Sequence, residues 1–444
     1  MLKKYLSLVT VIVLGGTAQA SDSFTKAVSE GDVSGQIRFF YIDRQYSGKK
    51  DTHRSALTGG GHLKYETGDL NGFSSGVAFY TTNNFGLGSD NLPGEVLDDS
   101  LLRGDSEGYN ILGEAYVKYK YKKLMLKLGR QKINTPMARA HDVRMLPNFY
   151  EGYFLTDKNL PNTTLTLAHI TKFAAGTFAN VYSGGISAAT GGYSYITKNS
   201  NNGKFSNIGK YAIGIKTDGI TLAGVKYTGI KNLKLQAWDY YVHDILNAIY
   251  LQADYSLPVG PTKLKFSAQY VGEKDVGDGL KRAKALGKVG FSEVDSDYYA
   301  LKVGASYSGL SGYVAYSYTA SDSKNPEGAN TINMWGSTIG FTNGMVSHHG
   351  FYSDTKTWKA VLAYNFKKLG INANASFYHC NFDLGKNNGY KHGVAWRDKE
   401  SGFDIKYYPS NVKNLQLRFR GNFPRDFVPG LDWDEYRLIV NYNF

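Results

Sequence analysis

Residues 128–151, with the sequence LGRQKINTPMARAHDVRMLPNFYE, interrupt an otherwise regular pattern. The segments on either side, 109–127 and 163–172, alternate apolar and polar residues with the period of two that is typical of strands. A loop of this length in a strand-rich chain is usually functional or disordered. Six apolar residues indicate that this one is packed: Ile133, Met137, Met145, Leu146, Phe149 and Tyr150.

The charge of this stretch predicts where it packs. It contains Arg130, Arg139 and Arg144. If the flanking strands belong to a closed barrel, a packed loop folds either against the outside or into the lumen, and arginines favour the lumen, which contains water. The stretch is therefore predicted to form the constriction of a pore.

The N-terminus has the features of an export signal. Lys3 and Lys4 precede an apolar run, and Ala18 and Ala20 flank Gln19 as in a cleavage site. We expect residues 1–20 to be a secretory signal peptide and residues 21–444 to be a single domain. No later segment approaches the roughly 18 apolar residues that a membrane-spanning helix needs.

Composition favours a membrane barrel over a soluble secreted protein, although it does not exclude the latter. The chain has 35 Tyr and 23 Phe but 10 Pro, and barrels place aromatic residues in two belts at the membrane interfaces. The single cysteine, Cys380, excludes an internal disulfide.

Alternation continues to the last residue, and the connections are asymmetric. Short ones such as 228–231 and 367–370 take turns with long ones such as 273–297 and 320–356, as in bacterial outer-membrane proteins. We count roughly 17 segments, expect a weak strand hidden within 174–210, and favour an even number. The sequence predicts an all-β, transmembrane antiparallel β-barrel of about 18 strands with an inward-folded constriction loop.

The net charge is +13, which first suggests nucleic acid, lipid phosphate or acidic substrates. The chain has no long basic run, basic helix or zinc-ligand spacing, so nucleic acid is not expected as a partner. Because alternate residues of barrel strands face inward, distributed Lys and Arg would line a channel.

Strand parity selects the candidate lining residues. Within 414–422, Leu415, Leu417 and Phe419 share one face, which places Arg418 and Arg420 on the lumen face. The same parity adds six inward-facing cations: Arg38, Lys127, Lys234, Lys265, Lys302 and Arg437. For each lysine the alternative is that it merely solvates a water-filled lumen.

Arg130 is an exception, since it falls on the leucine face by strict count. Either a bulge intervenes at Gly129 or the strand has already left the lipid band. From the loop, Arg130, Arg139 and Arg144 are expected at the narrowest point. Asp142 and Glu151 would supply the opposing charge that orients a zwitterion, or would pair with these arginines.

Three stretches resemble the OprD family of outer-membrane substrate-specific porins. They are LGRQKINTP followed by DVRMLPNFYEG at 128–152, LQLRFR at 415–420, and the final strand ending in Phe444. The resemblance implies that the third external loop folds inward and that LQLRFR contributes to a basic ladder for carboxylates. Guanidinium groups bind carboxylates bidentately, and several such sites in series keep any one from retaining the solute.

The resemblance also implies location and partners. We expect a passive channel of the bacterial outer membrane that takes up small carboxylate-bearing solutes, such as amino acids, peptides or aromatic and other organic acids. It would contact membrane lipid and lipopolysaccharide, and Phe444 would be recognised by the outer-membrane assembly machinery. Both a monomer and a homotrimer remain open, and no cofactor or metal is implied.

Other functions are weaker interpretations. A general anion-preferring diffusion porin and a plugged-barrel adhesin would use the same strands. A barrel lipase is disfavoured, because the G-x-S-x-G match at 72–76 opens an ordinary strand instead of a strand-to-helix turn. His348 and His349 are expected in a solvated external loop, with metal binding there the less favoured alternative.

Overall fold

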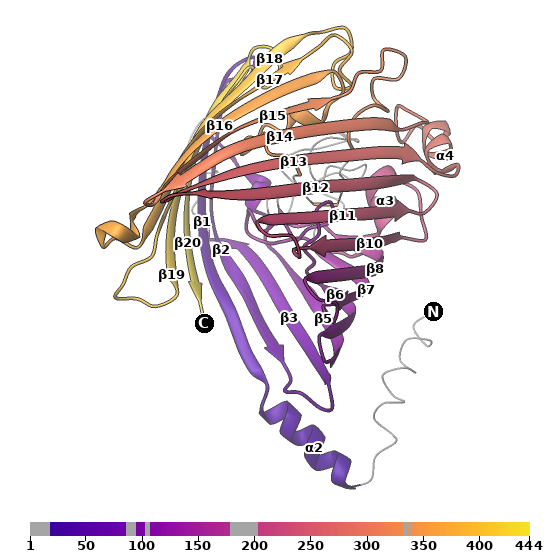
Figure 1. The fold of residues 1–444 in the computed structure, drawn as a ribbon, viewed down its shortest axis with the longest axis vertical. Coiled ribbons are helices and arrows are strands. Elements are labelled where there is room, and N and C mark those ends of the chain that lie inside the picture. Colours follow the sequence, from indigo (N-terminus) through magenta and orange to yellow (C-terminus); the bar gives the residue numbers. More distant parts are fainter. Residues whose placement is uncertain (1–17, 86–94, 103–106, 178–202, 333–334, 337–338) are drawn as a thin grey trace.

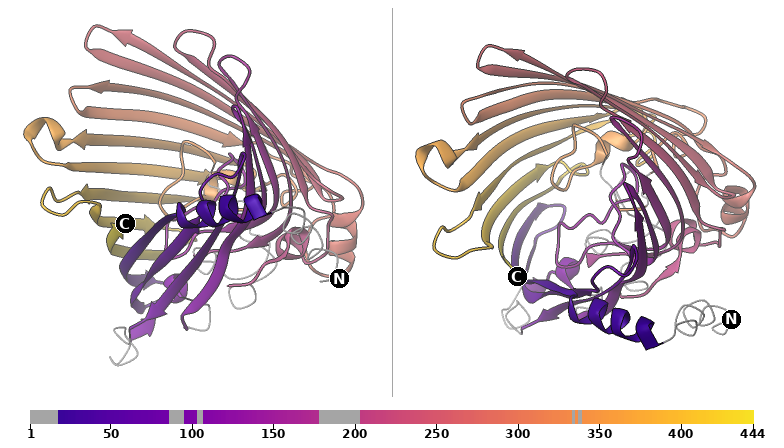
Figure 2. Two further views of the ribbon diagram at one scale, coloured as in Figure 1. Left: turned by 90° about the horizontal axis from the view of Figure 1, so that it is seen from below. Right: turned by 60° about the horizontal axis from the view of Figure 1, so that its bottom comes forward.

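The strands of a computed structural model wrap round a central space into which loop segments fold (Figures 1 and 2). The structure describes residues 18–85, 95–102, 107–177, 203–332, 335–336 and 339–444. The strands that form the wall are β1 (Asp32–Gly48), β2 (Thr52–Glu66), β3 (Phe73–Asn84), β5 (Tyr109–Tyr121), β6 (Leu124–Gln131), β7 (Phe149–Asp157), β8 (Thr163–Ala174), β10 (Ile220–Tyr227), β11 (Leu233–Val242), β12 (Leu246–Val259), β13 (Thr262–Asp275), β14 (Asp295–Tyr307), β15 (Leu310–Thr319), β16 (Thr355–Asn365), β17 (Ala373–Leu384), β18 (Trp396–Tyr407), β19 (Leu415–Arg425) and β20 (Leu431–Asn443).

The wall closes on itself because β1 pairs antiparallel with both β2 and β20. Two further strands are not members of the ring. β4 (Glu95–Leu97) pairs parallel with β2, and β9 (Ser206–Asn207) pairs with β8. The described sheet has 20 strands, so the ring contains 20 − 2 = 18. The predicted strand number and closed antiparallel barrel are confirmed.

Helices are few and short in the described part of the chain. The α-helices are α2 (Ala18–Ser29), α3 (Ile208–Ile213) and α4 (Gly279–Ala285), and the 3₁₀ helices are η2 (Asp99–Leu101), η4 (His349–Phe351) and η5 (Phe366–Leu369). No helix among the described residues is long and apolar enough to cross a membrane. α2 runs through the expected cleavage point, and residues 1–17 lie outside the described ranges, so the signal peptide stays a prediction.

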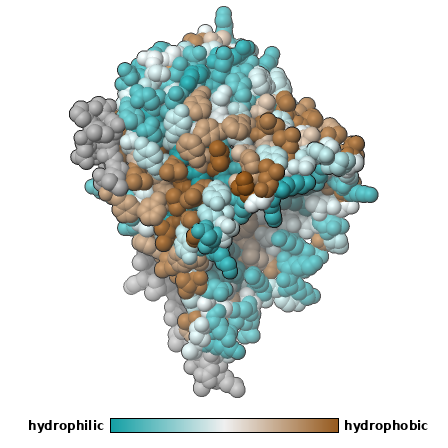
Figure 3. Space-filling view, turned by 90° about the vertical axis from the view of Figure 1, so that its left-hand side faces the viewer, coloured by the Kyte–Doolittle hydropathy of each residue, from teal (hydrophilic) through white to brown (hydrophobic). Residues whose placement is uncertain are grey.

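The two faces of each strand differ as the alternation predicts. On β14 the side chains of Tyr299, Leu301 and Val303 point outward and are 49%, 61% and 53% exposed. Tyr298 and Ala300, between them in sequence, are buried on the inner side. Hydrophobic residues gather in a band across the wall, with hydrophilic residues beyond it (Figure 3). This band is the surface that meets hydrocarbon.

One strand of the ring was not anticipated. β7 falls where the constriction stretch was expected to end, whereas residues 174–210 contribute only the two-residue β9 in their described part. β7 pairs with β6 and β8, but Gly152 and the register shift to β8 beside it interrupt its alternation. Within the predicted stretch 128–151, the loop therefore spans only residues 132–148.

The second long connection, residues 320–354, also departs from expectation. It was predicted to be external, yet Phe351 and Tyr352 are buried against the inner side of the barrel. His348 and His349, expected to be solvated, are 3% and 1% exposed. The connection folds inward because its scattered apolar residues, such as Ile332, Phe351 and Tyr352, find partners on the lumen faces of distant strands.

The band of outward apolar residues makes a testable prediction about stability. Val303 lies midway between Tyr299 and Tyr307 on the outer face of β14, at the middle of the band. A lysine at the middle of a bilayer costs about 2–4 kcal/mol. We expect Val303→Lys to lower the free energy of unfolding in lipid vesicles by that amount.

Ser306→Lys, on the inner face of the same strand, is the matched control and should change the free energy of unfolding by less than about 0.5 kcal/mol. Equal losses in the two variants would show that Val303 does not face hydrocarbon.

Candidate functional site

The inward loop 132–148 is held by hydrogen bonds to the wall and to the second inward loop. The backbone N–H of Met137 donates to Tyr240 Oη at 3.2 Å, and Tyr150 Oη donates to the carbonyl of Arg139 at 2.7 Å. The Arg139 N–H donates to the carbonyl of Trp335 at 3.2 Å. The two loops thus form one packed unit inside the barrel.

Gly336 permits this contact between the loops. Its φ of +79° is left-handed, and a Cβ there would lie 2.0 Å from Asn148 Nδ2 and 2.7 Å from the Arg139 carbonyl oxygen. A side chain at this position would push the loops apart.

A cluster of five buried charges fixes loop 132–148 to the wall. Arg44 lies 3.0 Å from Asp98 and 2.8 Å from Glu435. Arg144 of the loop lies 3.6 Å from Glu435, and Arg437 also pairs with Glu435. Burial, together with the charge of Arg437, lowers the pKa of Arg144 to about 9, so it remains a cation at neutral pH.

This cluster corrects one expectation. Arg144 was predicted to meet the solute at the narrowest point, but it is 0% exposed and lies behind the lumen surface. Its charge is neutralised within the protein, where it holds the loop to β20.

Asp142 and Arg38 pair at the surface of the same loop. Arg38 Nη1 is 2.6 Å from Asp142 Oδ1, and Arg38 Nε donates to Asn441 at 2.8 Å. The Asp142 side chain is 43% exposed. The structure thus pairs Asp142 with a wall arginine and not with an arginine of its own loop.

Arg418 and Arg420 face the lumen, as strand parity predicts. Arg418 Nε donates to Asp404 Oδ1 at 2.7 Å and its Nη2 to the other oxygen, while Arg420 Nε lies 3.7 Å and Lys406 Nζ 4.0 Å from Asp404. One carboxylate therefore holds three cations in a row across β18 and β19.

A cavity of about 580 Å³ lies beside this row at the end of the barrel with the short turns. Arg38, Gln416, Arg418 and Asn441 are among the side chains that line it. Arg437 continues the same face, directly opposite Arg420 in the register, but is 2% exposed.

The other predicted cations also lie on inner faces. Lys127 Nζ is 3.7 Å from Glu114 and 3.5 Å from the centre of the Tyr116 ring. Lys302 Nζ lies 4.1 Å from the centre of the Phe341 ring of the second loop. Lys265 follows the inward parity of β13, and Lys234 lines a cavity with Arg139.

Arg130 and Glu151 lie elsewhere and correct the prediction. β5, β6 and β7 pair without a register shift at Gly129, so Arg130 stays on the outer face of Leu128. There it pairs with Glu151 at 3.0 Å, and Glu151 also pairs with Lys172. The absence of a shift excludes the bulge at Gly129, and neither residue belongs to the constriction.

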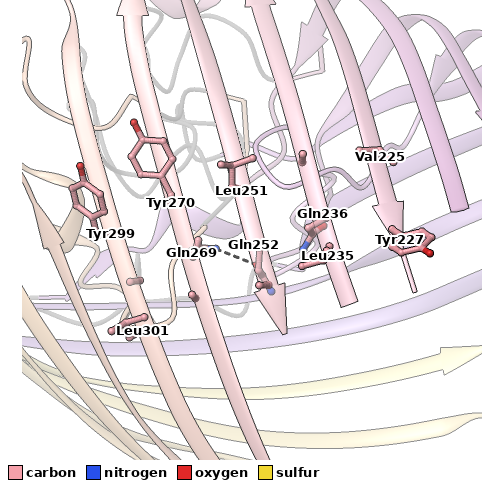
Figure 4. A pocket seen from close by; sticks show the side chains of 14 residues that line it. Val225, Tyr227, Leu235, Gln236, Leu251, Gln252, Gln269, Tyr270, Tyr299 and Leu301 are labelled. Carbon is pink, nitrogen blue, oxygen red and sulfur yellow. Dashed lines mark hydrogen bonds between the residues drawn. The ribbon is translucent and has the colours of Figure 1, made fainter. Parts of the chain in front are cut away.

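The outer wall has an apolar hollow of about 740 Å³ over β10–β14 (Figure 4). Val225, Leu235, Leu251, Tyr270 and Leu301 line it with their outward side chains. Because these residues belong to the band that faces hydrocarbon, this hollow opens outward and is not part of the lumen.

Sequence reasoning missed several inner residues. Asp404, Lys406 and Lys226 obey the same parity as the predicted cations and could have been found by applying it to every strand. Glu435 also follows the parity of β20, but its three arginine partners come together only in the folded barrel.

The chain is similar to known outer-membrane proteins over nearly its whole length. The family model described as outer membrane porin, OprD family, matches residues 27–444. The chain is 25% identical over 442 residues to Porin D of Pseudomonas aeruginosa, covering 91% of this chain and 89% of that protein. It is 22% identical over 440 residues to the porin-like protein GalP of Pseudomonas putida, covering 94% and 92%.

Solved structures show the same fold. OccK9 (OpdG) of Pseudomonas aeruginosa has a TM-score of 0.74 at 19% identity, with 94% of this chain and 99% of that chain covered. OpdK of Pseudomonas aeruginosa, crystallised with vanillate, has a TM-score of 0.71 at 17% identity, with 93% and 98% covered. OccAB4 of Acinetobacter baumannii has a TM-score of 0.71 at 16% identity, with 94% and 98% covered.

The buried charge cluster predicts the effect of removing its shared carboxylate. Glu435→Gln leaves Arg44, Arg144 and Arg437 short of a counter-charge, and breaking a buried ion pair costs about 3–5 kcal/mol. We expect loop 132–148 to undock, with higher and noisier single-channel conductance and a lower free energy of unfolding. Glu30→Gln, which removes a surface pair with Lys26, is the control and should change neither. An unchanged conductance in Glu435→Gln would contradict the role of the cluster.

The contact between the two loops predicts a pH dependence. Burial, with Arg139 nearby, lowers the pKa of His141 to about 4 from 6.5, and burial beside His141 lowers that of His348 to about 3. At pH values between 6.5 and these lowered pKa values, the histidines bind more protons in the undocked loops than in the docked loops. Docking therefore weakens as the pH falls through this window. Single-channel recordings should show increasing loop-opening events from pH 7 to pH 4.

The double variant His141→Gln with His348→Gln should flatten this dependence. His392→Gln, in an exposed position, should leave it intact. A profile that is the same in all three proteins would assign the pH dependence to other groups.

Proposed function

This chain belongs to the OprD family of outer membrane porins, and we propose that it selectively passes small carboxylate-bearing solutes along its lumenal arginines. The protein is a channel of the outer membrane, not an enzyme, and its outer wall contacts lipid and lipopolysaccharide. The solutes proposed are amino acids, peptides, and aromatic or other organic acids.

The proposal is supported by three arginines of the inner wall, namely Arg38, Arg418 and Arg420. In the register, β1 and β19 both pair with β20, so these side chains share one inner surface near the end of the barrel with the short turns. Asp142 and Asp404 hold the guanidinium groups in place, and the side chains of Arg38, Arg418 and Arg420 are 8%, 22% and 12% exposed. A solute carboxylate can replace such a carboxylate with little rearrangement, because it offers the same bidentate geometry.

Selectivity is supported by the two loops inside the barrel. Loop 132–148 and the described part of the connection 320–354 pack side chains inside the barrel, so a solute passes close to charged groups. A general diffusion porin with anion preference would show conductance that rises linearly with solute concentration, whereas a selective channel saturates.

Two further proposals concern the outer-membrane assembly machinery and the oligomeric state. Phe444, whose backbone exchanges hydrogen bonds with Gly35, ends the strand that we propose the assembly machinery recognises. The homotrimer remains one of two proposed oligomeric states, the other being the monomer. Chemical crosslinking of the purified channel distinguishes them.

The test of the proposed function is planar-bilayer conductance under a KCl gradient. The reversal potential should show anion preference, and added benzoate or glutamate should reduce the chloride current. In the double variant Arg418→Gln with Arg420→Gln, the same loss of chloride current should require about tenfold more carboxylate. The reason is that a charge-assisted hydrogen bond contributes about 1.5–3 kcal/mol.

Arg397→Gln is the matched control, because it removes an arginine paired with Asp383 at an exposed position. Cation preference in the folded wild-type channel would overturn the proposal.

A further inference from the structure

A second cavity lies between the inner wall at β10–β13 and the two inward loops. Its volume is about 430 Å³. Arg139 reaches it from loop 132–148, Lys226 and Lys234 from the wall, and Phe341 from the second loop. It is separate from the cavity beside Arg418, with which it shares no lining residue.

The three cations of this cavity differ from Arg38, Lys127 and Arg418 in the absence of a paired carboxylate among the described residues. Arg38, Lys127 and Arg418 each have a carboxylate within 4.0 Å. Within the described part of the chain, Arg139, Lys226 and Lys234 have no ion pair at that distance.

One negative charge lies next to the cavity. Asp254 is the cross-strand partner of Lys234, but its carboxylate oxygens accept hydrogen bonds from Gln252 and Ser267, both at 2.7 Å. Counting it in full, three cations and one carboxylate give 3 − 1 = 2 net positive charges around the cavity. A bound solute with one negative charge would leave one of them unbalanced.

The wall between the cations is polar and uncharged. Gln236, Gln252 and Gln269 lie directly opposite one another on β11, β12 and β13, and Lys226 is the partner of Gln236 on β10. Gln269 Nε2 donates to Tyr250 Oη at 2.7 Å, which fixes the row. Two lysines at one end of a rigid amide row, facing an arginine across the cavity, offer two separated places for carboxylates.

We propose that this cavity binds a small dicarboxylate, with one carboxylate at Lys226 and Lys234 and the other at Arg139. The proposal rests on the carboxylate pathway above and specifies the solute that binds best at the constriction. Arg139 belongs to the loop and the lysines to the wall, so a bound dianion bridges the two elements that define the opening.

The experiment compares succinate with butyrate, which have the same number of carbons but two charges and one. The full channel is reconstituted in planar bilayers at pH 7.5, where both acids are fully ionised, and each is titrated against the chloride current. We expect succinate to half-block at a concentration at least about tenfold lower than butyrate, since the second carboxylate adds charge-assisted hydrogen bonds.

Variants assign this difference to the cavity. Lys226→Gln with Lys234→Gln should reduce the difference to about twofold or less, and Arg139→Gln, on the other side of the cavity, should do the same independently. Lys231→Gln removes one positive charge from the exposed turn between β10 and β11 and should leave the difference unchanged.

The outcomes separate the two proposals. Equal half-block by succinate and butyrate in an anion-selective channel would overturn the dicarboxylate site and leave the carboxylate pathway standing. A difference that survives in all three cavity substitutions would place the site elsewhere and overturn the inference as well. Channels without anion preference would overturn the proposed function itself.

Discussion

The constraint on which the structure depends is that backbone polar groups in hydrocarbon must find partners within the protein. A sheet meets it only by closing, and here β20 returns to β1 over a long antiparallel register from Gln36 with Asn443 to Gly48 with Leu431. Gly35 and Phe444 extend the closure by two backbone hydrogen bonds of 2.8 and 3.1 Å. Once the ring is closed, every strand has one face in lipid and one in the lumen, and the alternation of residues follows.

A ring of 18 strands encloses more space than wall side chains can fill, so loops occupy it. Packing a loop against a polar wall buries charges, and buried charges are tolerated only when paired. The cluster of Arg44, Asp98, Arg144, Glu435 and Arg437 meets this requirement with residues from four separate segments. The size of the opening therefore depends on side chains that no solute touches.

Features that depend on local alternation could be predicted from the sequence. Arg38, Arg418 and Arg420 were placed on the lumen face because parity within one strand decides it. The sequence does not reveal β7, because Gly152 interrupts its pattern and its pairing depends on neighbours. The sequence does not decide which face Arg130 occupies, because only the register of β6 with β5 and β7 decides it.

The inward course of residues 320–354 could not be predicted for a different reason. Its stabilising partners are distant in sequence: Glu400 of β18 accepts backbone hydrogen bonds from Met345, Val346 and Ser347, and His349 Nδ1 lies 2.7 Å from Asp398. Nothing within the loop itself indicates that these groups will be within reach. Its direction is decided by tertiary contacts that a sequence pattern does not contain.

The distribution of counter-charges gives the two inner surfaces different physical properties. Where Asp404 or Asp142 neutralises an arginine, the surface is nearly balanced, and on the proposed pathway a carboxylate would bind there by exchange. Where Lys226 and Lys234 lack an ion pair within the described residues, the field extends into the water of the lumen, and low-dielectric walls concentrate it. On the proposed pathway, these cations raise the local concentration of anions at the loops, while the paired arginines provide sites weak enough to release them towards the end with the short turns.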